Sequence, residues 1–247
     1  MKRNLRIKPP FFEIGPKNYL YGDQILDLAI YADQAAEKYD IRVIFTTPYA
    51  NIERVAEQTR NLLVFAPYMD CAPVGRGLAN VLPESLRAAG ASGVMLNHAE
   101  RPMGLAELCK TMERARRLGM LSIVCADSIQ ETKAVAMLGP DLMVTEPTEL
   151  IAMGKPAEIS YVKAAVDAVL EIDPHIGILV GGGISTGQDA YNVIAAGADA
   201  AGADATGASS AIATAKDPNA VVEEMLRAVR AAWDERENRR IYRYGPI

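Results

Sequence analysis

The stretch LSIVCADSIQETKAVAMLGPDLMVT, residues 121–145, contains one complete unit of the predicted fold. Apolar runs at 121–124 and 142–145 predict strands, because buried parallel strands are apolar throughout instead of alternating. Between them, residues 129–138 have the spacing of a helix, and Gly139 follows where a left-handed helix cap is expected. The stretch therefore predicts a strand–helix–strand unit of a parallel sheet.

The same alternation continues on both sides of this stretch and gives eight strand-then-helix units. The predicted strands cover residues 11–14, 43–45, 62–65, 93–96, 121–124, 142–145, 176–180 and 199–203. The predicted helices cover residues 23–39, 52–60, 83–89, 105–118, 129–138, 158–171, 187–196 and 219–236. Eight such units in 247 residues favour an α/β fold, a closed (β/α)8 barrel, over an open sheet.

We expect the whole chain, residues 1–247, to form one barrel domain, since no long linker or low-complexity stretch divides it. A short extension at about 1–10 precedes the first strand, and a basic, aromatic tail at about 236–247 follows the last predicted helix. A frayed end and a strap on a neighbouring subunit are both open interpretations of this tail.

The composition restricts the classes of partner and compartment. A formal net charge of −5 disfavours wholesale nucleic-acid binding. The sequence contains no run of 18 apolar residues, so we expect no membrane span. Its basic start lacks the apolar segment of a signal peptide, so we expect no targeting segment. The cysteines, Cys71, Cys109 and Cys125, have no metal-binding spacing, so we expect reduced, mostly buried thiols in a cytoplasmic protein.

Active-site groups of such a barrel are expected where strands end and the following loops begin. Lys17 follows the first strand, although a lone lysine there is more often only solvated. His98 follows the fourth strand, where a histidine can act on substrate oxygens, and a structural role fits the sequence equally well. His175 precedes the seventh strand at the opposite end of the barrel, and we interpret it as structural.

Glu146 follows the sixth strand directly. A carboxylate at the tip of a buried strand is costly unless it is used, which favours a functional role. Glu149 is the competing carboxylate, and we interpret it as a first-turn or structural charge. The loop continues through 151–156, whose small residues predict a lid over the site.

Two glycine- and hydroxyl-rich segments predict a phosphate site. The sequence VGGGISTG at 180–187 lets backbone N–H groups approach an anion, and the following helix would add its N-terminal dipole. The predicted loop after the eighth strand, 202–211, is also small and hydroxyl-rich. Phosphate sites of eightfold barrels are usually formed by the loops after strands seven and eight, so the two segments support one another.

Together these motifs resemble the triosephosphate isomerase family, specifically its short archaeal-type branch, from about residue 12 to about residue 230. NHAER at 97–101 is similar to the family's histidine motif, EPTELI at 146–151 to its glutamate and lid motif, and GGGISTG at 181–187 to its phosphate loop. VLPE at 81–84 and the dipeptide at 124–125 also match. The resemblance implies that Lys17 is an electrophile, His98 a neutral proton shuttle and Glu146 the base.

The resemblance also implies the remaining site residues and the reaction. Supporting and phosphate-binding residues would be Asn97, Glu100, Gly154, Gly182, Gly183, Ser209 and Ser210. The implied reaction interconverts glyceraldehyde 3-phosphate and dihydroxyacetone phosphate in glycolysis and gluconeogenesis, without a cofactor or metal. The expected partner is a small phosphorylated sugar, with no nucleic acid and no membrane, and the expected assembly is a homodimer or homotetramer.

The sequence departs from the family around the substrate and the subunit contact. Gly15 stands where the family usually has asparagine, the lid reads IAMG at 151–154 where relatives have IGTG, and the segment 75–80 lacks a Thr-Gly pair. The predicted loop after the eighth strand is also about two residues longer than in the family. These changes leave open an isomerase of a four-carbon sugar phosphate and, from another class, a non-catalytic phosphosugar-binding protein. The sequence has no dinucleotide fingerprint and no metal-ligand cluster, which disfavours a redox or metal enzyme.

Overall fold

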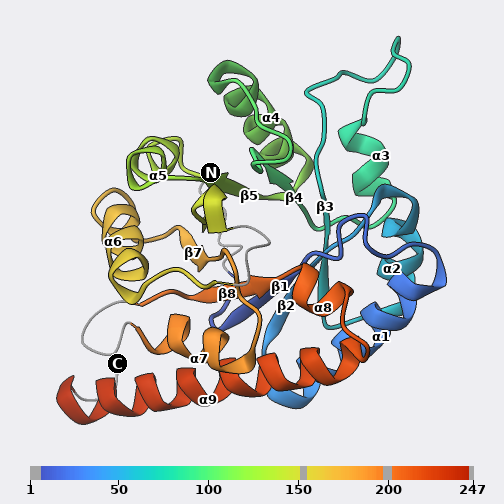
Figure 1. Ribbon diagram of the computed structural model, residues 1–247. Helices are drawn as coiled ribbons and strands as arrows, with labels where there is room; N and C mark the ends of the chain where they lie inside the picture. Colours follow the sequence, from blue (N-terminus) through green and yellow to red (C-terminus); the bar gives the residue numbers. More distant parts are fainter. Residues whose placement is uncertain (1–6, 151–154, 197–201, 245–247) are drawn as a thin grey trace.

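The computed structural model describes residues 7–150, 155–196 and 202–244, and within these its eight parallel strands close into a barrel in sequence order (Figure 1). The strands are β1 Phe11–Ile14, β2 Arg42–Thr46, β3 Leu62–Ala66, β4 Gly93–Leu96, β5 Leu121–Ala126, β6 Leu142–Thr145, β7 Gly177–Val180 and β8 Ala205–Ala208. The predicted (β/α)8 barrel is confirmed.

Helices surround the barrel. They are α1 Asp23–Tyr39, α2 Ile52–Gln58, α3 Pro83–Ala88, α4 Leu105–Leu118, α5 Ile129–Ala136, α6 Ile159–Leu170, α7 Gly187–Ala195, α8 Ser210–Ala213 and α9 Pro218–Tyr244, with short 3-10 turns at Tyr49–Asn51 and Thr148–Leu150. Apart from β8 and α9, the predicted elements agree with these bounds to within two residues at each end.

Side chains along each strand alternate between two apolar cores. On β1, Phe11 belongs to the core inside the barrel, whereas Phe12 and Ile14 pack outward in the core beneath the helices. The inner core is built from residues such as Phe65, Ile123 and Leu179, which interdigitate across the barrel. The barrel is therefore a filled scaffold that fixes the ends of its strands, where the loops carry the polar groups.

The eighth strand was predicted in the wrong place. Residues 202–203 precede it, residues 199–201 lie outside the described part, and β8 occupies residues 205–208 of the expected loop. Its sequence, Ala-Thr-Gly-Ala, has little strand propensity, which is why the strand was missed. Glycine is needed at position 207 because a Cβ there would lie 2.8 Å from the backbone oxygen of Glu13 on β1. Because α8 begins at Ser210, only Ser209 separates it from β8.

The C-terminal segment is helical as far as the structure describes it, through Tyr244. We expected the last helix to end at residue 236, but α9 extends through Tyr244 and packs along α7 and α1 (Figure 1). Charged pairs at helical spacing, such as Arg240 with Glu237, support its polar end. Arg236 is buried, and its guanidinium donates to the backbone oxygens of Ile194 and Ala203. Residues 236–244 therefore do not form a frayed end, since α9 continues through them, and the interpretation of a strap on a neighbouring subunit stays a prediction.

The cysteines differ from expectation in burial. Cys125 is buried on β5, but Cys71, in the loop after β3, and Cys109, on the outer face of α4, are exposed. The prediction of mostly buried thiols is therefore wrong for two of them, because an exposed loop and the solvent face of a helix accept cysteine as readily as a core does. All three thiols are free in the described structure. Within the described ranges, no helix has both the length and the apolar character needed to cross a bilayer.

Candidate active site

A pocket of about 650 Å³ lies at the carboxyl ends of the strands. The predicted site residues that line it are Lys17, His98, Glu100, Glu146, Gly182, Gly183, Ser209 and Ser210. They come from the ends of β1, β4, β6, β7 and β8, so the closed barrel brings together groups that are far apart in the sequence. The volume is typical of a site for a small ligand.

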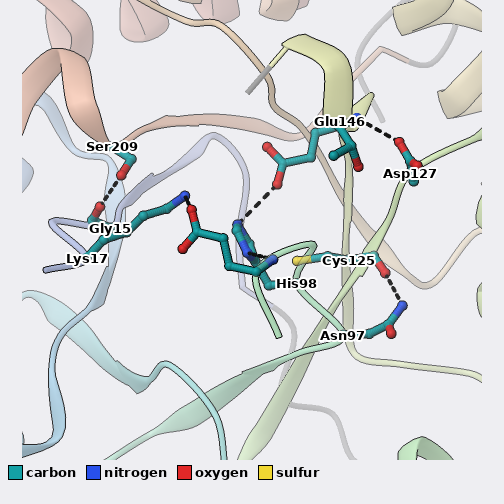
Figure 2. A network of polar contacts seen from close by, with 10 residues as sticks. Gly15, Lys17, Asn97, His98, Cys125, Asp127, Glu146 and Ser209 are labelled. Carbon is teal, nitrogen blue, oxygen red and sulfur yellow. Dashed lines mark hydrogen bonds and ion pairs between the residues drawn. The ribbon is translucent and has the colours of Figure 1, made fainter. Parts of the chain in front are cut away.

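Lys17 is held over the pocket by a local strain and a distant partner. Its backbone is left-handed, with φ of 48°, which is unusual for a residue with a side chain. Its Nζ, shown in Figure 2, donates to Glu100 Oε1 at 2.8 Å. This hydrogen bond is the main cause that lowers the pKa of Glu100. The pair joins the loop after β1 to the loop after β4, so the ammonium group is fixed beside the pocket.

His98 and Glu146 face one another across the pocket. His98 Nε2 lies 3.5 Å from Glu146 Oε1, and the two side chains are only 14% and 16% exposed (Figure 2). The other ring nitrogen of His98, Nδ1, accepts a hydrogen bond from the backbone N–H of Glu100 at 3.1 Å. The loop after β4 thereby fixes the orientation of the imidazole ring.

Burial sets the charge of this pair. Burial is the largest cause that lowers the pKa of His98; Lys17 lowers it further and Glu100 opposes them. The imidazole is therefore neutral near pH 7, and because its Nδ1 is an acceptor, its proton is on Nε2. Burial also raises the pKa of Glu146, against the effect of Lys17, so its carboxylate is a stronger base than an exposed glutamate.

Asn97 supports the site from behind. Its backbone is left-handed, its Nδ2 donates to the backbone oxygen of Cys125 at 3.0 Å, and its Oδ1 accepts from the N–H of Met103 at 3.0 Å. Figure 2 shows its contact with Cys125, and Asn97 also lines a second, smaller cavity. The side chain thus holds the turn that carries His98, which fits the predicted supporting role.

The glycine segment after β7 presents backbone donors to the pocket. Gly182 and Gly183 are left-handed, with φ of 91° and 70°, and within the described ranges their N–H groups have no protein acceptor. Ser209 stands opposite, and its Oγ donates to the backbone oxygen of Gly15 at 2.6 Å. Gly154, also predicted for the phosphate, and most of the predicted lid lie outside the described residues.

The expected contribution of the α7 dipole is not supported. The N–H groups of Ser185 and Thr186 donate to Asp189 Oδ2, and that of Gly187 donates to Glu224 Oε1 on α9 at 2.7 Å. These carboxylates occupy the donors that the helix start would otherwise offer to an anion. A phosphate at this face would therefore rest on Gly182, Gly183 and the residues after β8.

Gly183→Ala is expected to lower kcat/KM for a phosphorylated substrate by about 100-fold, because a misplaced loop disturbs positioning. A Cβ at this position would lie 1.9 Å from the backbone oxygen of Lys155, so the loop must move. Gly139→Ala is the matched control: Gly139 is also left-handed, but its Cβ would meet nothing within 4 Å. Steady-state kinetics should change only in the first variant, and equal effects would contradict the assignment.

Among the pocket residues that were not predicted, one is a buried-strand carboxylate. Glu13, within β1, lines the pocket floor. A search limited to the ends of strands misses Glu13, because it lies within the strand. A carboxylate inside the apolar run FFEI is nevertheless a sequence signal for a functional group. Glu149 and His175 are exposed, and His175 lies before β7 at the other end of the barrel. In the described ranges no group of three His, Cys, Asp or Glu side chains is arranged to hold a metal ion.

Comparisons with known proteins agree with this geometry. The family model described as triosephosphate isomerase matches residues 17–225. The chain is 35% identical to the triosephosphate isomerase of Sulfolobus acidocaldarius, covering 93% of this chain and 99% of that protein. It is 32% identical to the enzyme of the same name from Saccharolobus solfataricus, over 89% of this chain and 96% of that protein. A third, from Methanothermobacter thermautotrophicus, is 33% identical over 81% and 89%.

Proposed function

Because the chain belongs to the triosephosphate isomerase family, in its archaeal branch, we propose that it interconverts glyceraldehyde 3-phosphate and dihydroxyacetone phosphate. The observation that carries this proposal is the meeting of Lys17, His98 and Glu146 in one pocket, with His98 Nε2 at 3.5 Å from Glu146 Oε1. A glutamate base beside a neutral histidine is the established arrangement of this family.

Each group has a role that its surroundings support. The Glu146 carboxylate removes a proton from the carbon next to the substrate carbonyl, which gives an enediolate, and then returns the proton to the neighbouring carbon. The Nε2–H of His98 donates to the oxygens of the enediolate and moves protons between them. The Lys17 ammonium stabilises the negative charge that develops there. After the proton has been returned to carbon, Glu146, His98 and Lys17 are back in their starting protonation states. The reaction therefore needs no oxidant and no reductant.

The phosphate of the substrate is proposed to bind the N–H groups of Gly182 and Gly183 together with Ser209 and Ser210. These residues line the same pocket as the catalytic trio, so one small molecule can contact both sets. Gly154 would join them from the loop after β6. Asn97 and Glu100 are proposed to hold His98 and Lys17 in place, in keeping with their hydrogen bonds.

The comparisons do not favour the alternative of a four-carbon substrate, since the named relatives are triosephosphate isomerases over nearly their full length. A homodimer or homotetramer working in the cytoplasm, in glycolysis and gluconeogenesis, stays a prediction. Sedimentation of the purified chain would test the assembly, and a monomer would contradict it.

A coupled assay of the purified protein tests the proposal. Its kcat/KM is measured for glyceraldehyde 3-phosphate and for a four-carbon ketose phosphate under identical conditions. A clear preference for the triose is expected. A preference for the four-carbon sugar would change the proposed substrate but keep the mechanism. If neither sugar is turned over, the proposed activity is wrong.

A further inference from the structure

Glu13 is a carboxylate in a position where the barrel otherwise holds apolar side chains. It lies between Phe12 and Ile14, which face outward, so its own side chain enters the barrel above Phe11. It lines the floor of the pocket that also contains Lys17 and Glu146. The side chain is half-buried, which is consistent with contact to the pocket and not with a position sealed in the core.

Two glycines make room for this carboxyl group. A Cβ on Gly15 would lie 2.9 Å from Glu13 Oε1, and a Cβ on Gly207 would lie 3.2 Å from Oε2. Gly207 is the register partner of Glu13 on β8. Any larger residue at either position would push the carboxyl group away, so the two strands and the loop after β1 form a cradle around it.

The protein leaves one oxygen of this group without a partner. Within the described ranges, Glu13 Oε1 is buried and takes part in no hydrogen bond. Buried polar atoms are normally paired, and the exceptions need an explanation such as a catalytic role or an absent ligand. A carboxyl group that lines a substrate pocket and is only partly paired by the protein is suited to a hydrogen bond with the substrate.

Its surroundings favour the neutral form. Burial is the main cause that raises the pKa of Glu13 to about 7, and the charge of Glu146 raises it further, while Thr46 and Lys17 act in the opposite direction. The buried thiol of Cys125 on β5 also faces this region, and burial raises its pKa well above its usual value. His98 and Glu100 are further titratable groups that line the same pocket. A neutral carboxyl group has an O–H donor, whereas a carboxylate has none.

We propose that Glu13 is a further substrate-binding acid of this site, whose protonated carboxyl donates a hydrogen bond to a carbonyl or hydroxyl oxygen of the bound sugar. The inference rests on the proposed isomerase function and adds a residue to it. Ionised Glu13 cannot donate, and its charge would repel the enediolate. The active form of the enzyme therefore carries Glu13 protonated and Glu146 ionised, so that two carboxyl groups in one pocket have opposite roles.

The test is the pH profile of kcat/KM for wild type, Glu13→Gln and Glu13→Ala. The wild type should lose about tenfold per pH unit above pH 7, because a single ionisation removes the donor. Glu13→Gln keeps a donor of the same shape and should remain within about tenfold of wild type at pH 6, with the alkaline loss abolished. Glu13→Ala should lose roughly 100-fold in kcat at pH 6.

A control separates this role from a purely structural one. Ile44→Val trims the strand neighbour of Glu13 in the inner core and should leave the alkaline loss unchanged. If Glu13→Gln keeps the wild-type alkaline loss, or if Glu13→Ala matches wild type, the inference is overturned while the isomerase stands. If the wild type itself shows no turnover, the proposed function fails, and a second measurement then decides on Glu13.

That measurement is an NMR titration of protein labelled with carbon-13 at glutamate carboxyls, with Glu13→Gln used to assign the signal. Glu13 is expected to titrate near pH 7 alone and at higher pH with dihydroxyacetone phosphate bound, since a hydrogen bond to the neutral form favours it. No change in its titration on adding dihydroxyacetone phosphate, or a shift to lower pH, would overturn the inference.

Discussion

Glu146→Gln is expected to lower kcat about 1000-fold and to leave KM for the triose phosphate within about threefold, as for loss of a general base. The amide keeps the size of the side chain but cannot accept a proton from carbon. The 3.5 Å approach of Glu146 Oε1 to His98 Nε2 places the base beside the group that acts on the substrate oxygens. Steady-state kinetics in both directions provide the measurement.

Glu149→Gln is the matched control, because Glu149 is an exposed carboxylate three residues further along the same loop. It should leave kcat unchanged. The pH dependence gives a second check on Glu146. Its carboxyl pKa is raised, so wild-type activity should fall with decreasing pH as this group becomes protonated, at a higher pH than for an exposed glutamate. Full activity of Glu146→Gln would remove the base from the mechanism.

Lys17→Met is the second change with a large expected effect. It should lower kcat/KM by roughly 100- to 1000-fold, since it removes a fixed positive charge from the place where the enediolate becomes negative. Methionine keeps much of the length and apolar body of the side chain. The change also breaks the 2.8 Å contact with Glu100, whose carboxylate then remains beside the pocket without its cation.

Lys133→Met is the control for Lys17→Met. Lys133 also pairs with a glutamate, Glu171, at 2.9 Å, but on the outer surface. An exposed pair of this kind contributes about 0–1 kcal/mol to stability, so activity should not change. The pKa of Glu146 should rise in Lys17→Met, because Lys17 lowers it in the wild type, and the acid limb of the pH profile should move to higher pH. Equal kinetics for the two variants would contradict the role of Lys17.

Strongly patterned elements were predictable from sequence. The strands at 11–14 and 142–145 and the helices at 23–39 and 105–118 were placed at their observed bounds, because apolar runs, helical spacing and glycine caps agree there. The strand β8 was not predictable in this way. Gly207 on this strand is small because a Cβ there would lie 2.8 Å from the backbone oxygen of its register partner Glu13, a constraint that only the closed barrel imposes.

The candidate site likewise contains residues that the sequence predicts and residues that only the folded barrel reveals. Lys17, His98 and Glu146 follow strands directly, so the rule that barrel chemistry lies at strand ends finds them. Glu13 escapes that rule because it lies within β1, and its significance depends on the space left by Gly15 and on an oxygen without a partner. The occupied donors at the start of α7 were predictable only in part: Thr186 and Asp189 form a local capping box, whereas Glu224 comes from another helix.

The most direct test of the central claim is an NMR experiment in deuterium oxide. Dihydroxyacetone phosphate is incubated with the wild-type protein, and both the product and the deuterium content of the exchanging carbon are followed over time. The account predicts the appearance of glyceraldehyde 3-phosphate together with deuterium at carbon, because Glu146 carries the proton between carbons and exchanges it with solvent. Binding of dihydroxyacetone phosphate with neither product nor exchange at carbon would contradict it and would leave a phosphosugar-binding barrel without isomerase activity.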